Sequence, residues 1–146
     1  MHIHDIDEIM VTPVPCAAQT VRAAARLLTR RYEEALRPTG LSASQYTVLT
    51  AVIGAGGLSQ GLLGEALAFE QTTVTRLVGV MLRRGILELK ADPKDGRRKI
   101  VHATAEGVAL YEQGKPLWHQ AQADTIGSLT DDEWKATRSA LRKLTE

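Results

Sequence analysis

The sequence predicts a mostly α-helical fold with one small β-hairpin, and three observations support this. Apolar residues recur at steps of three and four over long stretches of the 146-residue chain, as they do on one face of an α-helix. Residues that favour helix N-termini precede several of these stretches. Asp95 and Gly96 supply the strongest hairpin turn in the chain, between two short β-compatible runs.

Composition indicates an ordinary water-soluble protein. Hydrophobic residues make up 44% of the chain and charged residues 24%, enough apolar material for one compact core. No apolar run approaches the roughly 20 residues of a membrane span, so no membrane partner is expected. The opening Met1–Met10 lacks the features of a secretory signal, and a cytoplasmic location is expected. Cys16 is the only cysteine, which excludes an intrachain disulfide.

The first half of the chain predicts three helices. Residues 1–15 show no sustained periodicity and are expected to be a flexible arm. One apolar stripe predicts a helix from Cys16 to about Arg37. Ser42, three residues before a glutamine, forms a capping box for a second helix. Ser59 caps a third, short helix that contains two glycines, each of which lowers helix stability by roughly 1 kcal/mol relative to alanine.

A fourth helix, predicted from Gln71 to about Arg84, has two chemically different faces. The apolar face consists of Val74, Leu77, Val78, Met81 and Leu82. The opposite face carries Gln71, Thr72, Thr75, Arg76, Gly79 and Arg83. This division indicates a helix that packs on a core with one face and presents hydrogen-bonding and cationic groups with the other. Gly85 favours the left-handed residue that follows a helix end.

The remaining elements are a hairpin and two helices. Short strands are predicted at Leu87–Lys90 and Arg98–Ala103. A helix over 104–126 contains Pro116, which is expected to kink or break it near Gly114. A second capping box, four residues after that helix, predicts the last helix of the chain.

A helix pair joined by a tight turn, with a polar and cationic second helix, is the unit that enters a DNA major groove. On this face Arg76 can bind guanine, Gln71 can bind adenine, and the methyl groups of Thr72 and Thr75 can contact thymine. The net charge of +1 does not indicate a nucleic-acid partner by itself, but residues 76–99 hold eight basic residues and three acidic ones. Double-stranded DNA is therefore the expected partner.

The hairpin strengthens this interpretation. Its tip carries four basic residues, Lys94, Arg97, Arg98 and Lys99. A basic hairpin beside a helix-turn-helix can act as a wing that contacts the minor groove and the phosphate backbone. Asp95 can pair with Arg97 and fix the direction of its guanidinium group. The sequence thus predicts a winged helix-turn-helix DNA-binding region at residues 41–103.

Two segments resemble the MarR family of transcriptional regulators. EQTTVTRLVGVMLRRGIL, Glu70–Leu87, is similar to that family's recognition helix, and DPKDGRRKIVHATAEG, Asp92–Gly107, resembles its wing signature. The resemblance covers about residues 16–146. It implies wing roles for Asp95 and Arg97. The resemblance also implies that Thr72, Thr75 and Arg76 contact the major groove.

The resemblance also implies a homodimer formed by the terminal helices, with a small ligand or an oxidation event that releases DNA. Independent support comes from apolar stripes on the first and last helices, since exposed stripes of that size imply a partner. We therefore expect residues 16–40 and 104–146 to form a helical dimerisation region. A two-fold dimer places two recognition helices roughly 34 Å apart, which predicts an inverted-repeat operator. A ligand-responsive repressor is expected, with a pocket that includes Tyr32, Tyr46 and Trp118.

Several alternatives stand beside this hypothesis. Organic-peroxide sensors of the family carry a reactive cysteine near the start of the first helix, and a thiol at a helix N-terminus has a lowered pKa, so thiol-based sensing through Cys16 is an alternative. The cysteine of those sensors aligns near Ala18, two residues away and on another helix face, which favours a packed or merely exposed thiol instead. A winged-helix protein-interaction module without DNA binding is another. GLSQG at residues 57–61 matches the nucleophile elbow of esterases, but the chain lacks the strands such a site needs. We expect no enzyme activity and no cofactor. His2, His4 and Asp5 supply too few ordered ligands for a metal site.

Overall fold

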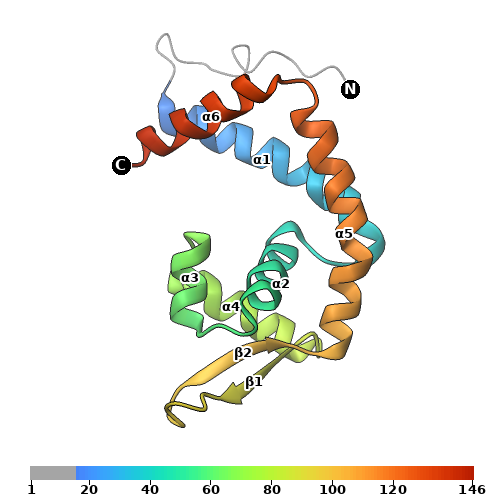
Figure 1. Ribbon diagram of the computed structural model, residues 1–146, viewed down its shortest axis with the longest axis vertical. Coiled ribbons are helices and arrows are strands. Elements are labelled where there is room, and N and C mark those ends of the chain that lie inside the picture. Colours follow the sequence, from blue (N-terminus) through green and yellow to red (C-terminus); the bar gives the residue numbers. More distant parts are fainter. Residues whose placement is uncertain (1–15) are drawn as a thin grey trace. The chain divides into compact units, whose positions relative to one another are not determined.

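The computed structural model describes residues 16–146, which form six α-helices, one 3₁₀ turn and two β-strands. Expectations for residues 1–15 and for His2, His4 and Asp5 lie outside these described residues. The element bounds are α1 Ala17–Leu36, η2 Arg37–Thr39, α2 Ala43–Ala55, α3 Gln60–Leu67, α4 Gln71–Arg83, β1 Leu87–Ala91, β2 Lys99–Ala103, α5 Ala105–Ile126 and α6 Asp131–Leu144 (Figure 1). The predicted mostly α fold with one hairpin is confirmed.

The chain divides into two compact units. One contains α1 up to Ala35 together with His119–Glu146, and the other is Leu36–Trp118. The second unit is wider than the predicted DNA-binding region 41–103 because the start of α5 packs onto α2. Gly114 of α5 makes this approach possible, since a side chain there would lie 3.1 Å from the ring of Tyr46.

The core of the Leu36–Trp118 unit lies among α2, α3, α4 and the hairpin. Leu49, Leu63 and Met81, one from each helix, are fully buried. Val74 and Val78 of the predicted apolar face are 1% exposed, whereas Leu77 and Leu82 are only partly buried. Full burial of such a side chain stabilises the fold by about 1.5–3 kcal/mol. The apolar face of α4 therefore fixes which face remains exposed.

Local hydrogen bonds begin and end the helices as the sequence predicts. The hydroxyl of Ser42 accepts from the backbone N–H of Gln45, whose side chain accepts from the backbone N–H of Ser42. Thr130 begins α6 with the same reciprocal pair of bonds. The hydroxyl of Ser59 caps α3. Gly85 ends the α4 segment with φ +73°, a conformation in which glycine has no Cβ to strain.

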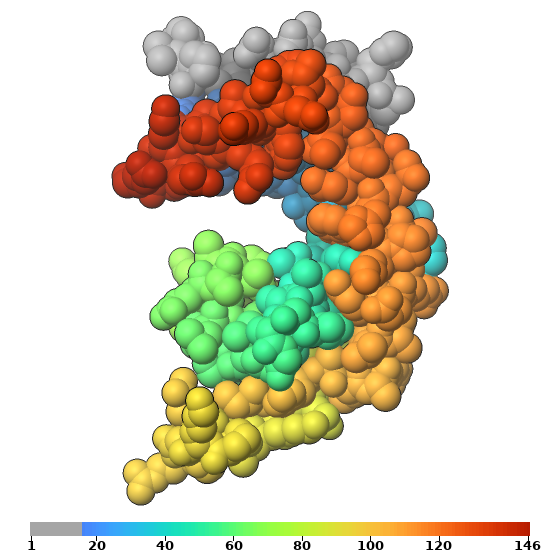
Figure 2. Space-filling view, in the orientation of Figure 1, coloured from blue at the N-terminus to red at the C-terminus, as the bar shows by residue number. Residues whose placement is uncertain are grey.

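The hairpin is antiparallel, with Leu87 opposite Ala103 and Ala91 opposite Lys99. A separate bridge joins Leu58, in the turn between α2 and α3, to Val101 of β2. These bonds attach the hairpin to the helix pair within one unit. In the space-filling view the hairpin projects from the rest of that unit as a narrow arm (Figure 2).

Helix α5 is continuous from Ala105 to Ile126 with Pro116 inside it (Figure 1). Of the predicted kink or break near Gly114, the break is therefore wrong, and the kink stays a prediction. Proline removes one ladder hydrogen bond. Packing on both sides of Pro116 compensates, because Tyr111 and Trp118 both contact the core cluster. Tertiary contacts here outweigh a local helix-breaking preference.

The other unit contains α1, the end of α5 and α6. The Tyr32 hydroxyl of α1 donates a hydrogen bond to the side-chain oxygen of Gln122 in α5. Helix α6 has no buried residue. Large apolar side chains remain exposed on this unit, namely Val21, Leu27, Leu28, Leu141 and Leu144.

Candidate nucleic-acid interface

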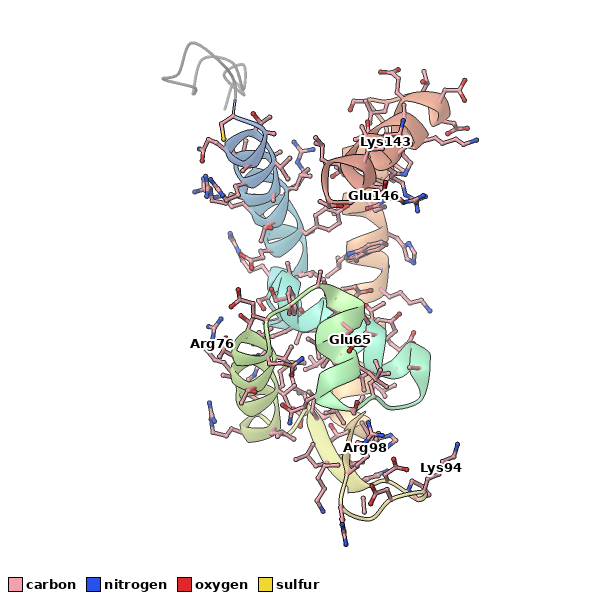
Figure 3. All side chains as sticks on the ribbon, turned by 90° about the vertical axis from the view of Figure 1, so that its left-hand side faces the viewer. Glu65, Arg76, Lys94, Arg98, Lys143 and Glu146 are labelled. Atoms are coloured by element: carbon pink, nitrogen blue, oxygen red, sulfur yellow. The ribbon has the colours of Figure 1, made fainter. Side chains whose placement is uncertain are left out.

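The polar face of α4 is exposed, as its pattern predicts. Thr72, Thr75 and Arg76 are not buried in the core that holds Val74 and Val78, and Figure 3 shows Arg76 on the outer side of the helix. The Thr75 hydroxyl already donates to the backbone oxygen of Gln71 at 2.8 Å. The methyl group of Thr75 is therefore the part of this side chain suited to a base contact.

Gln71 has a structural contact that the sequence did not reveal. A Cβ added at the buried Gly64 of α3 would lie 2.3 Å from the Gln71 Nε2 atom, so the amide group lies directly over that glycine. This contact explains why a glycine, which weakens α3, stands at position 64, since any larger residue would displace Gln71. Gln71 remains exposed and lies where α3 meets the start of α4.

The tip of the hairpin is shaped by two aspartates. The Asp92 carboxylate accepts from the backbone N–H of Lys94 at 2.9 Å, and the Asp95 carboxylate accepts from the backbone N–H of Arg97 at 3.1 Å. Asp95 therefore pairs with the backbone of Arg97. The predicted ion pair with the guanidinium group is absent from the part of the chain that the structure describes. This arrangement fixes the loop and leaves the cation for another partner.

Six exposed basic side chains lie on α4 and the hairpin. We call this set the cationic surface: Arg76, Arg83, Lys94, Arg97, Arg98 and Lys99. Figure 3 shows Lys94 and Arg98 on the hairpin. A neighbouring cation, Lys90, is instead paired with Glu88 at 3.1 Å. Since all six belong to the Leu36–Trp118 unit, one folded unit holds both a groove-sized helix and a basic hairpin.

Arg84 is a positioning residue that sequence reasoning missed. Its Nη1 atom donates to the side-chain oxygen of Gln45 at 3.1 Å and lies 3.4 Å from the backbone oxygen of Gly40. Arg84 therefore attaches the end of α4 to the start of α2 and supports the capping box there. The only signal in the sequence was the capping box itself, which does not show what else contacts Gln45.

Comparison with known proteins identifies the family. Residues 39–98 match the profile of the MarR family. The transcriptional regulator MosR of M. tuberculosis, solved in complex with DNA, is 35% identical and superposes with a TM-score of 0.79 over 89% of this chain and 93% of MosR. The chain belongs to the MarR family of transcriptional regulators.

Two further relatives of this MarR-family chain are informative. The transcriptional repressor NicR of Pseudomonas putida is 34% identical over 104 residues, which is 71% of this chain and 66% of NicR. BpsR of Bordetella bronchiseptica is 27% identical and superposes with a TM-score of 0.82 over 94% of this chain and 98% of BpsR. That structure concerns the regulation of BpsR's DNA binding by 6-hydroxynicotinic acid.

The three predicted pocket residues have different surroundings in this MarR-family fold. Tyr46 is 4% exposed, and its ring stacks with those of Tyr111 and Trp118 at centroid distances of 5.4 and 6.1 Å. Burial, followed by repulsion from Tyr111, raises the pKa of Tyr46 to about 12. Tyr32 belongs to the other unit, where it bonds Gln122. The structure brings Tyr46 and Trp118 together within one unit, whereas Tyr32 belongs to the other unit.

Cys16 lies immediately before α1 and is exposed. Hydrogen bonds from the backbone N–H groups of Gln19 and Ala18 lower the pKa of the Cys16 thiol. A lowered thiol pKa increases the fraction of reactive thiolate at neutral pH.

Other site types find no support in residues 16–146. Ser59 is 8% exposed and its hydroxyl caps α3, while the strands described there form only one two-stranded sheet, so the esterase motif lacks its setting. No metal-binding group of three or more His, Cys, Asp or Glu residues occurs in that part of the chain. None of its helices is long and apolar enough to cross a membrane.

Proposed function

We propose that this MarR-family chain is a cytoplasmic repressor that binds an inverted-repeat operator as a homodimer and releases it in response to a small-molecule effector. The observation that carries the proposal is the cationic surface, where exposed basic residues of α4 and of the hairpin belong to one compact unit. Helix α4 enters the major groove, and the hairpin reaches the backbone and minor groove beside it.

Contacts divide into two kinds in this proposal. Arg76, Thr72, Thr75 and Gln71 read bases, because they lie on the exposed face of α4. Cations of the hairpin bind phosphates and contribute affinity that does not depend on sequence. The MosR structure in complex with DNA, at 35% identity, supports DNA binding by this fold.

Dimerisation rests on the exposed apolar residues of α1 and α6. Leu28 is 41% exposed, Leu141 42% and Leu144 61%. Leu144 also borders a surface hollow with Ala17 and Val21. Covering these side chains with a second copy stabilises the assembly by about 25 cal/mol per Å² of apolar area removed from water. Closed two-fold symmetry then repeats the cationic surface along one duplex.

The effector is a small molecule in this proposal, supported by the regulation of BpsR by 6-hydroxynicotinic acid. In this proposal Tyr46 and Trp118, whose rings stack within one unit, border its pocket. A ligand acts by binding one form of the dimer more tightly than another, and its effect equals that difference in affinity.

One experiment tests operator binding directly. The purified chain is titrated by fluorescence anisotropy against an inverted-repeat duplex recovered from genomic DNA and against a scrambled duplex, over a range of salt. Steep salt dependence with preference for the repeat supports the proposal. Absence of binding at low salt overturns it and favours the protein-interaction module.

The lowered thiol pKa at Cys16 favours a second candidate, peroxide-controlled DNA binding. Mild peroxide then weakens duplex binding by the wild-type chain, whereas the matched variant Cys16→Ser stays unaffected. Equal duplex affinity before and after peroxide treatment of the wild-type chain rules this candidate out.

A further inference from the structure

Helix α6 carries a cationic hollow that operator binding does not use. Four side chains line it: Lys135, Arg138, Ser139 and Arg142. Their spacing of three, four and seven residues places them on one helix face, beside the apolar stripe of Trp134 and Leu141. All four are exposed. The set consists of three cations and one hydroxyl, each of which can donate hydrogen bonds.

Among the residues that the structure describes, charge is unevenly distributed along α6. Acidic residues of α6 are confined to its first turn, and one of them, Glu133, is engaged in the capping box. No carboxylate lies within ion-pair distance of Lys135, Arg138 or Arg142 in the described part of the chain. Arg138 and Arg142 are four residues apart, a spacing at which like charges destabilise a helix.

The helix dipole explains only part of this arrangement. Cations in the last turn are favourable because the C-terminal carbonyl groups carry partial negative charge, and Arg142 lies in that turn. Lys135 lies in the first half of α6, where the dipole gives a cation no such benefit. Lys135 does have Asp131 and Asp132 four and three residues before it, at spacings where opposite charges interact. Arg138 has no acidic residue three or four positions away, so its guanidinium group is open to an external anion.

We propose that this hollow binds the phosphate group of a small molecule. The hollow has a volume of about 280 Å³ and is lined by this one face of α6, so it offers contacts to a small group such as a phosphate. Arginine guanidinium groups match phosphate oxygens in paired hydrogen bonds. A phosphate monoester carries nearly two negative charges and three acceptor oxygens, which suits three cations and a hydroxyl better than a single carboxylate does.

Isothermal titration of the full chain at constant ionic strength tests this site. The probes are inorganic phosphate, glycerol 3-phosphate and acetate. Saturable binding of either phosphate probe, with at least tenfold weaker binding of acetate, is expected. Tighter binding of glycerol 3-phosphate than of inorganic phosphate identifies a phosphate ester as the preferred ligand. Equal affinity for the two probes identifies free phosphate as sufficient. If neither phosphate probe binds, or acetate binds equally well, the proposal is wrong.

Matched variants separate this site from general surface charge. Arg138→Gln removes a cation that lines the hollow, and Lys143→Gln removes one from the same helix outside it. Both side chains are exposed, so circular dichroism is expected to show intact folding. Phosphate affinity falls about tenfold or more in Arg138→Gln, the size of one lost charged hydrogen bond, and stays unchanged in Lys143→Gln. Equal losses of phosphate affinity in Arg138→Gln and Lys143→Gln overturn the proposal. The proposal is also overturned if Arg138→Gln loses duplex binding while its phosphate binding stays intact.

Discussion

Replacing Arg97 by glutamine tests how the hairpin contributes to DNA binding. The Asp95 carboxylate bonds the backbone N–H of Arg97, so the guanidinium group is available for a phosphate, and Arg97→Gln leaves the loop bond in place. Each phosphate contact contributes about 0.9 to the slope of log affinity against log salt. A dimer loses two contacts, and the slope becomes shallower by about 1.8.

The corresponding change in affinity is large enough to measure. Between 50 and 200 mM salt, the ratio of wild-type to variant affinity shrinks about twelvefold if the slopes differ by that amount. Fluorescence anisotropy with a labelled operator duplex and a random duplex provides both slopes, which are expected to change equally. Lys143→Gln, which removes a charge outside the cationic surface, is the control. An unchanged slope in Arg97→Gln, or an equal change in Lys143→Gln, refutes the phosphate role.

Three further predictions concern base recognition, packing and pH. Arg76→Lys keeps the charge but loses the paired guanine contact, so operator affinity falls by about 1–3 kcal/mol. Affinity for the random duplex in the same assay does not fall. A variant that keeps the wild-type base preference at every position of the operator contradicts this role. Gly107→Ala places a Cβ 2.1 Å from the Ile86 backbone oxygen, so the free energy of unfolding in urea falls by roughly 2 kcal/mol or more. The control Gly61→Ala, whose Cβ has nothing within 4 Å, keeps its stability. Equal stability of the two variants counts against the close approach of Gly107 to Ile86. Because burial raises the pKa of Tyr46 from 10.0 to about 12, the unfolded chain loses this proton first, so stability is retained below pH 10 and declines as pH rises toward 12. Tyr46→Phe removes that part of the alkaline decline in urea titrations, and identical pH profiles for the two proteins contradict it.

Features held by short-range hydrogen bonds could be predicted from the sequence. The capping boxes at Ser42 and Thr130 each join residues three positions apart, and both are present. The turn at Asp95 and the left-handed Gly85 are similarly local. The periodicity of α4 correctly separated its buried face from its exposed face because one pattern determines both.

Features that depend on distant residues could not be predicted. Arg84 contacts Gln45, which lies 39 positions earlier, and no local pattern encodes that pairing. Pro116 predicted a kink or a break, and packing around α5 keeps the helix unbroken. The sequence predicts only a base contact for Gln71, because its position over Gly64 depends on how α3 and α4 pack. The roles of the site residues on DNA remain predictions.

Recovery of genomic DNA bound by the protein tests the central claim most directly. The wild-type chain and a variant with Arg76→Glu and Arg97→Glu are each incubated with fragmented genomic DNA, and the retained fragments are sequenced. Enrichment of inverted repeats with half-sites about one helical turn apart is predicted for the wild-type chain alone. Enrichment of the same fragments by the charge-reversed variant, or fragments without two-fold symmetry, would contradict it.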